Sequence, residues 1–296
     1  MANTIPTALF DDIISQNALL AFNDTLLPLS VFSTDFGGEL QRGSDTVNVP
    51  VYAVDSGSNS FTDYISNAEK TLTNVSVAVN KHETKTAHFT DVEVAGTSAA
   101  SAERLGAQMG AGMAKAVMQD ILSVVTNANY STAAFVGAAS AWDSDDVIDV
   151  KDACDTADMP SQRGLVLADA YYNALLKDSA IKNAQNYGAD SGVRAGYIPA
   201  LEGFEVFQTG SVPANSENLV GFAANSNAIA IAMRYLEPQQ PEQYAAAERL
   251  EDGDTGIVLG WRDHYDANTG KRYLNLECNY GYSVGIAGGL KRITSA

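Results

Sequence analysis

The sequence predicts an α+β protein with a long β excursion outside its main body. Residues 45–54 and 72–79 alternate apolar and polar side chains, which is the period of a β-strand. Residues 98–128 contain few strong helix breakers and predict a helical rod of about 45 Å. Residues 255–265 and 272–280 flank a turn rich in Asp, Asn and Gly, which indicates a β-hairpin.

The composition and charge of the chain favour some classes of function and disfavour others. Apolar residues make up 46% of the 296 positions, so the chain can build a sizeable core. The formal charge of −18 disfavours binding to nucleic acid or to anionic lipids, because both require cations. No stretch approaches the roughly 18 apolar residues of a membrane span, and residues 1–12 lack the pattern of a secretion signal. The spacing of Cys154 and Cys278 favours two buried free thiols and folding in a reducing cytoplasm.

The N-terminal part begins with a helix and continues as an arm. A helix is predicted from Thr7 to about Asn23, and the Leu-Leu-Pro run at 26–28 ends it. Residues 31–40 then predict an extended arm with a glycine turn.

The β excursion has little apolar cover. Valines alternate along residues 45–54 and 72–79, a polar tip lies at 55–60, and a more polar third strand is expected at 82–94. Two long strands of this kind are not stable as an isolated unit in water. Their partner surface is therefore expected to come largely from another chain.

The C-terminal half predicts mixed helices and strands. Helices are expected from Ser144 or Asp145 to Asp158 and over 169–178, with a loop at 183–192. Strands are expected at 164–167, 203–207 and 228–233, and the last is apolar on both faces and so central. Residues 281–289 are expected to be irregular, followed by a short tail at 290–293.

Motifs for catalysis and cofactor binding are missing. His82 and His88 lie six residues apart, about 20 Å on a strand, which is too far for shared metal binding, and His264 lies in the hairpin. No nucleophile elbow or phosphate-binding loop occurs, and residues 143–146 favour a helix cap over a calcium loop. We therefore expect no catalytic, cofactor-binding or metal-binding residues. The many carboxylates leave a hydrolase that uses an acid pair as an open alternative.

Several phrases, in order, carry a family resemblance. Residues 35–49 resemble an arm-to-loop passage of the type G-E-x-x-x-G-D-T-V, with Ser44 inserted. Residues 196–207 resemble a phrase in which a strand follows I-x-G-F, and 212–213, 228–234 and the closing hairpin with Tyr280-Gly281 are also similar. Together these phrases resemble the major capsid protein of tailed bacteriophages, with the Hong Kong 97-type fold.

The resemblance implies five regions: an N-arm at 1–44, an extended loop at 45–95, a spine helix with part of the peripheral domain at 96–139, an axial domain at 140–235, and a peripheral return hairpin with the C-terminus at 236–296. It implies a structural protein that is not an enzyme. The expected products are pentamers and hexamers that form an icosahedral shell around double-stranded DNA.

The expected partners are further copies of the chain, a portal protein and a separate scaffolding protein, since the chain reaches its spine helix early and retains Met1. The resemblance leaves a decoration protein open. Assembly is expected in the bacterial host cytoplasm and the final location in the virion. Lys70, Lys81 and Lys85 are available for cross-linking, but nothing in the sequence marks one of them as reactive.

Contacts between subunits are expected from two regions. In the extended loop these are Val47, Val49, Ser56, Asn59, Phe61, Tyr64, Val75 and Val77, and in the N-arm they are Phe32, Asp35, Phe36 and Glu39. Three alternatives remain open: an encapsulin-like bacterial nanocompartment shell, an accessory protein that decorates or plugs a capsid, and a cytoplasmic hydrolase.

Overall fold

The computed structural model describes residues 7–35, 46–51, 73–96, 99–131, 133–184, 198, 200–253 and 255–296. It confirms the α+β class, with two six-stranded sheets and a separate two-stranded hairpin. The helices and 3-10 turns are α1 (Thr7–Leu26), η1 (Leu27–Val31), α2 (Asp91–Gly96), α3 (Ala99–Ile121), η2 (Leu122–Val124), α4 (Asn127–Tyr130), η3 (Ala139–Ala141), α5 (Ser144–Thr156), α6 (Asp169–Lys177), α7 (Ser179–Ala184), η5 (Pro241–Gln243) and η6 (Ala287–Gly289).

The strands are β1 (Ser33–Asp35), β2 (Thr46–Val51), β3 (Thr73–Ala78), β4 (Lys81–Thr90), β5 (Phe135–Val136), β6 (Arg163–Leu167), β7 (Ala200–Leu201), β8 (Phe204–Gln208), β9 (Leu219–Ala224), β10 (Ile229–Arg234), β11 (Ala246–Glu251), β12 (Val258–Asp266), β13 (Lys271–Val284) and β14 (Leu290–Thr294). No helix among the described residues has the length and apolarity needed to cross a membrane.

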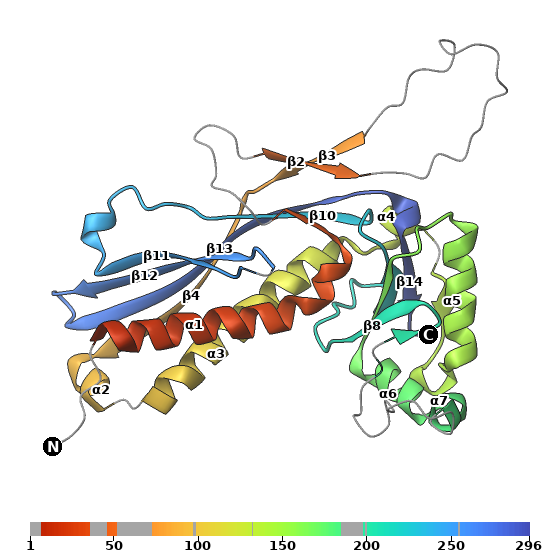
Figure 1. Ribbon diagram of the computed structural model, residues 1–296, viewed down its shortest axis with the longest axis horizontal. Coiled ribbons are helices and arrows are strands. Elements are labelled where there is room, and N and C mark those ends of the chain that lie inside the picture. Colours follow the sequence, from red (N-terminus) through yellow and green to blue (C-terminus); the bar gives the residue numbers. More distant parts are fainter. Residues whose placement is uncertain are drawn as a thin grey trace, which may run out of the picture.

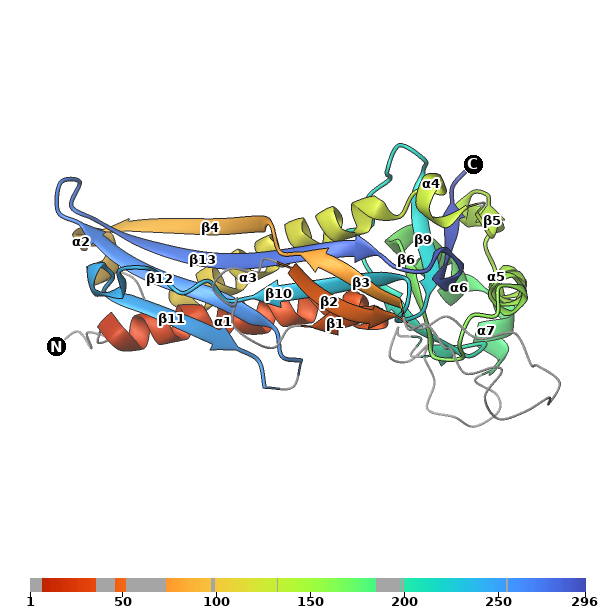
Figure 2. The same cartoon turned by 90° about the horizontal axis from the view of Figure 1, so that it is seen from above.

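The long sheet forms one end of the molecule, and α1 and α3 lie along one of its faces (Figures 1 and 2). Its strand order is β1-β10-β13-β12-β11, and β4 pairs with the remaining edge of β13. The two helices and the sheet share one core, to which Phe22, Met113, Trp261 and Leu276 contribute. The strand predicted at 228–233 is confirmed as fully buried and internal, because β10 lies between β1 and β13.

Two glycines set the distance between α1 and α3. A Cβ atom on Gly106 would lie 2.3 Å from the Ile14 carbonyl oxygen, and one on Gly110 would lie 2.0 Å from that of Ala18. Both positions thus require glycine. The small residues of α3 thus allow its backbone to pack closely against that of α1.

The second sheet lies at the other end, with the order β5-β14-β9-β6-β8-β7 (Figure 1). Helices α5 and α6 cover one face, where Val150, Tyr172 and Leu175 pack against Leu165 and Val206. The opposite face joins the first core through side chains such as Phe222.

The boundaries of three predicted elements are corrected, two of them helices and one a strand. The long helix ends at Ile121 rather than 128, because Val124, Val125 and Thr126 are consecutive β-branched residues, which are stiff in helices. The strand predicted at 82–94 ends at Thr90. A short helix follows, because Thr90 and Glu93 form a reciprocal capping box.

The third correction concerns α5. Asp143, rather than Ser144 or Asp145, is the cap, since its carboxylate accepts hydrogen bonds from the backbone N–H groups of Asp145 and Asp146. The helix ends at Thr156 rather than Asp158, which adopts a left-handed φ of 52°.

Several strands differ from the predictions. Strands β9 and β11 were not predicted. The supposed tail at 290–293 is strand β14, and β13 continues through Gly281 to Val284. Two strands also pair outside the regions predicted for them. Strand β10, from the region 140–235, pairs with β13 in the long sheet, and β14, from the region 236–296, pairs with β9 in the second sheet. These assignments depend on partners distant in sequence, which no local pattern encodes.

Candidate assembly site at the root of the hairpin

Strands β2 and β3 form an antiparallel hairpin outside both sheets (Figure 1). The register pairs Val47 with Val77 and Val49 with Val75, which confirms the two alternating strands. Val49 is 3% exposed and Val77 is fully buried, because both pack against Ala230 and Ala232 of β10. Val47 and Val75 are partly buried against the same cluster.

This packing corrects one expectation. The valine face does not depend on another chain for its cover, since the small side chains of β10 let the hairpin lie on its own subunit. Val49 and Val77 therefore support the hairpin from below and are not available as direct contacts with a neighbour. The edges of the hairpin differ from its covered valine face, because within the described ranges β2 and β3 pair only with each other.

The chain leaves the hairpin by crossing closely over β13. A Cβ atom on Gly281 would lie 2.0 Å from the carbonyl oxygen of Ala78, the last residue of β3. Beyond the crossing, β4 pairs with β13 over ten residue pairs, from Lys81 with Tyr280 to Thr90 with Lys271. Gly281 therefore marks the point at which the hairpin separates from the long sheet.

A polar cluster fixes this root to the end of α3. The Lys81 ammonium group lies 2.7 Å from Asp120 Oδ2 and 3.0 Å from the Tyr282 hydroxyl. The Tyr280 hydroxyl donates to Asp120 Oδ2 at 2.8 Å, and that of Tyr282 donates to Oδ1 at 3.2 Å. Asp120 thus joins the spine helix, β4 and β13.

The cluster shifts the acidity of its members. Burial would raise the pKa of Asp120, but hydrogen bonds from Lys81 and Tyr280 hold it below its ordinary value. Burial would lower the pKa of Lys81, but hydrogen bonds to Asp120 and Tyr282 raise it. Burial and the Asp120 carboxylate raise the pKa of Tyr280. The shifts of Lys81 and Asp120 favour their ion pair near neutral pH, and the shift of Tyr280 keeps its hydroxyl protonated as a donor.

The predicted contacts of the N-arm fall in different places. Phe32 is 3% exposed and its ring stacks on Phe222 at 5.7 Å, so it is a core residue and its predicted contact with a neighbour is corrected. Asp35 ends β1, whose backbone pairs in parallel with β10. Phe36, Glu39, Ser56, Asn59, Phe61 and Tyr64 lie outside the described residues.

Sequence reasoning missed the polar cluster. In the sequence, Lys81 is one of three available lysines and Tyr280-Gly281 closes the predicted hairpin, and neither pattern indicates a cluster. Nothing local connects Asp120 to them, because the contacts span 39 and 160 positions of the chain.

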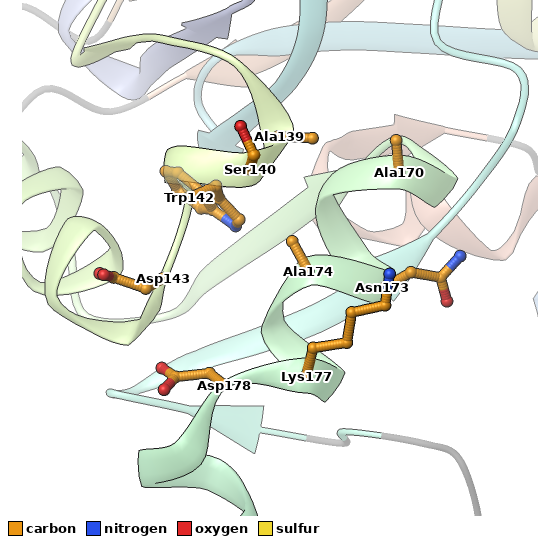
Figure 3. Close-up of a pocket in the computed structure, with 9 residues that line it drawn as sticks. All are labelled: Ala139, Ser140, Trp142, Asp143, Ala170, Asn173, Ala174, Lys177 and Asp178. Carbon is orange, nitrogen blue, oxygen red and sulfur yellow. The ribbon is translucent and has the colours of Figure 1, made fainter.

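A surface pocket of about 640 Å³ lies between η3 and α6 (Figure 3). Its lining consists of Ala139, Ser140, Trp142, Asp143, Ala170, Asn173, Ala174, Lys177 and Asp178. The carboxylates of Asp143 and Asp178 accept hydrogen bonds from backbone N–H groups at the starts of α5 and α7. None of the lining residues is a histidine or cysteine.

The histidines and cysteines have ordinary structural positions. His82 and His88 are exposed on β4, and His264 stacks on Tyr273 at 5.1 Å. The described part of the chain contains no group of three or more His, Cys, Asp or Glu residues that could hold a metal ion. Cys154 and Cys278 are buried free thiols, as expected.

Comparison with known proteins places this geometry in context. Residues 72–274 match a family model described as phage capsid protein. The fold is similar to the capsid of cyanophage P-SCSP1u, with 12% identity, a TM-score of 0.55, and coverage of 90% of this chain and 86% of that one. No curated protein sequence matches this one.

Two further solved structures are similar. The capsid of a native GTA particle gives 14% identity and a TM-score of 0.54, with coverage of 92% of this chain and 90% of that one. The virus-like particle from Pyrococcus furiosus gives 11% identity and a TM-score of 0.53, with coverage of 96% of this chain and 99% of that one. The fold is therefore of the Hong Kong 97 type.

Proposed function

The chain belongs to the phage capsid protein family and is a capsid shell protein, and we propose that it is the major capsid protein, which assembles as pentamers and hexamers into an icosahedral shell around double-stranded DNA. Its role is structural, and we propose that it carries no catalytic activity. Within this proposal the subunit consists of the five predicted regions, with two changes. Strand β10 belongs to the long sheet, which we assign to the peripheral domain, and β14 belongs to the second sheet, which we assign to the axial domain.

The hairpin is the observation that carries the assembly proposal. One of its faces is covered by β10, and β2 and β3 form a sheet of only two strands in the described part of the chain. Isolated two-stranded units are marginally stable in water, so a further partner surface would stabilise this one. We infer that residues 52–72, with Ser56, Asn59, Phe61 and Tyr64, extend from this hairpin onto a neighbouring subunit.

The proposed partners follow from the shell. Self-assembly is implied by the family, and we propose in addition a separate scaffolding protein, a portal protein and assembly in the bacterial host cytoplasm. A decoration protein would add to this set without changing the role of the subunit.

Deletion of residues 55–66 tests the proposal. The truncated subunit should keep the wild-type circular dichroism spectrum but fail to form shells in sedimentation and electron microscopy. Replacing the same residues with a Gly/Ser segment of equal length separates loss of side chains from loss of chain length, and it should also prevent assembly. Normal shells from both variants would contradict the proposed role of the hairpin.

A nanocompartment shell enclosing enzyme cargo is the second candidate. It is supported by the likeness to the virus-like particle from Pyrococcus furiosus. Nuclease treatment of particles purified from cells distinguishes the two, because a phage head protects DNA and a cargo shell protects protein.

A further inference from the structure

Two buried carboxylates share a single guanidinium group where α1 meets the long sheet. Asp263 of β12 is fully buried, and Arg272 of β13 donates from Nε to both of its oxygens at 3.0 Å. Arg272 Nη2 also donates to Asp11 of α1, which is 8% exposed. Figure 1 shows this end of α1 beside the ends of β12 and β13.

The arrangement leaves one negative charge without compensation. Arg272 balances one of the two carboxylates, and its bidentate contact goes to Asp263. Asp11 Oδ1 and Arg272 Nη1 have no hydrogen-bond partner among the described residues. Burial of an ionised oxygen without a partner is unfavourable, and protonation of the carboxyl group relieves it.

Other charged groups around Asp11 do not supply the missing cation. Asp12, on the same helix, is exposed and carries the same charge as Asp11. Glu103 and Arg104 at the corresponding end of α3 are exposed and form no ion pair with Asp11. On β11, Arg249 pairs with Glu251. His264 and Tyr273 follow Asp263 and Arg272 directly along their strands, so their side chains point to the opposite face of the sheet.

We propose that Asp11 is a proton-dependent clamp: its protonated carboxyl group holds the first turns of α1 against β12 and β13, and its ionisation loosens them. The acidity agrees with the geometry. Burial raises the pKa of Asp11 from 3.8 to about 6, Arg272 opposes this shift, and Asp263 adds to it.

The direction of the pH effect follows from linkage. A carboxyl group whose pKa is higher in the folded state binds its proton more tightly there, so acid stabilises the docked helix. The stabilisation is fully present below the ordinary pKa of 3.8 and is lost as the pH rises through about 6. The clamp therefore tightens in mild acid, whereas an ordinary salt bridge would weaken there.

A pair of adjacent variants tests the clamp. Asp11→Asn mimics the protonated group, and Asp12→Asn makes the same charge change at an exposed neighbour. Hydrogen exchange of residues 7–17, corrected for intrinsic rates, should show the opening equilibrium of wild type and of D12N rising between pH 4 and pH 7. The rise should be on the order of a hundredfold, as expected for a shift of about two pKa units. In D11N it should be flat.

A direct titration keeps the proposal testable should D11N fold poorly. Carboxyl-carbon NMR of the wild-type protein should give Asp11 a midpoint near 6, and Asp263→Asn should move that midpoint lower. A wild-type midpoint at or below 4, or an unchanged pH dependence of exchange in folded D11N, would overturn the clamp.

Discussion

Gly110 of α3 lies directly on the backbone of Ala18 in α1, so close that a Cβ atom at position 110 would come within 2.0 Å of the Ala18 carbonyl oxygen. The two helices run in the same direction, because Gly106 meets Ile14 four residues earlier on both. The N-terminal helix thereby contacts the spine helix directly through its backbone, beside the large side chains such as Phe22 and Met113 that the two helices contribute to the core.

Gly110→Ala should destabilise the subunit by about 1–3 kcal/mol, because the added methyl group forces α1 and α3 apart. Gly112→Ala is the matched control, since its Cβ atom would meet only Lys85 Cε at 3.9 Å. That variant should gain up to about 1 kcal/mol from higher helix propensity. Chemical denaturation of both variants measures the difference, and equal effects would contradict the close contact.

Gly281→Ala should displace the hairpin while leaving both sheets folded. The new methyl group would meet the Ala78 carbonyl oxygen at the crossing of β3 over β13. We expect faster hydrogen exchange in residues 73–79 and loss of shell formation. Gly253→Ala serves as the control, because no atom lies within 4 Å of its Cβ position. Wild-type exchange in G281A would show that the crossing tolerates a side chain.

Lys81→Met should loosen the root of the hairpin, because Asp120 loses its cation. Lys115→Met is the matched control, since Lys115 is an exposed lysine of α3 outside the cluster. Limited proteolysis within residues 73–80 provides the measurement. The contribution of the pair should be lost in acid as the pH falls through the lowered pKa of Asp120, and in base as it rises through the raised pKa of Lys81. Because both side chains are about one-third exposed, salt should weaken the effect. Equal cleavage of both variants would exclude the cluster as an anchor.

Neither cysteine should react with a thiol reagent in the folded subunit at pH 8. Burial raises the pKa of Cys154 to about 11 and that of Cys278 to about 12, and thiolate is the reactive form. Two thiols should become titratable with Ellman's reagent on unfolding. Rapid reaction of one equivalent in native buffer would contradict the burial of that residue.

The sequence predicted elements whose signal is local. The turn at 266–270 and the alternation of Val47, Val49, Val75 and Val77 each lie within a few residues, and the structure confirms them. The element boundaries that were predicted wrongly also have local signals, namely the capping contacts of Thr90 with Glu93 and of Asp143.

The arrangement of the residues at the root of the hairpin could not be predicted from the sequence. Cover for Val77 comes from Ala230 and Ala232, and the partner of Lys81 is Asp120. Such pairs are set by how the sheets fold together, and no periodicity in a single sequence reports them. The expectation that the hairpin lacks its own cover failed for this reason.

Strand β14, formed by residues 290–294, lies between β9 and β5, whose residues begin at 219 and 135. During synthesis, the chain must therefore emerge from the ribosome as far as residue 294 before this sheet can close. Until then, the edge of β9 that β14 occupies in the folded subunit is open to strands of other chains. Rapid pairing of β14 with β9 would therefore protect this edge from aggregation during synthesis.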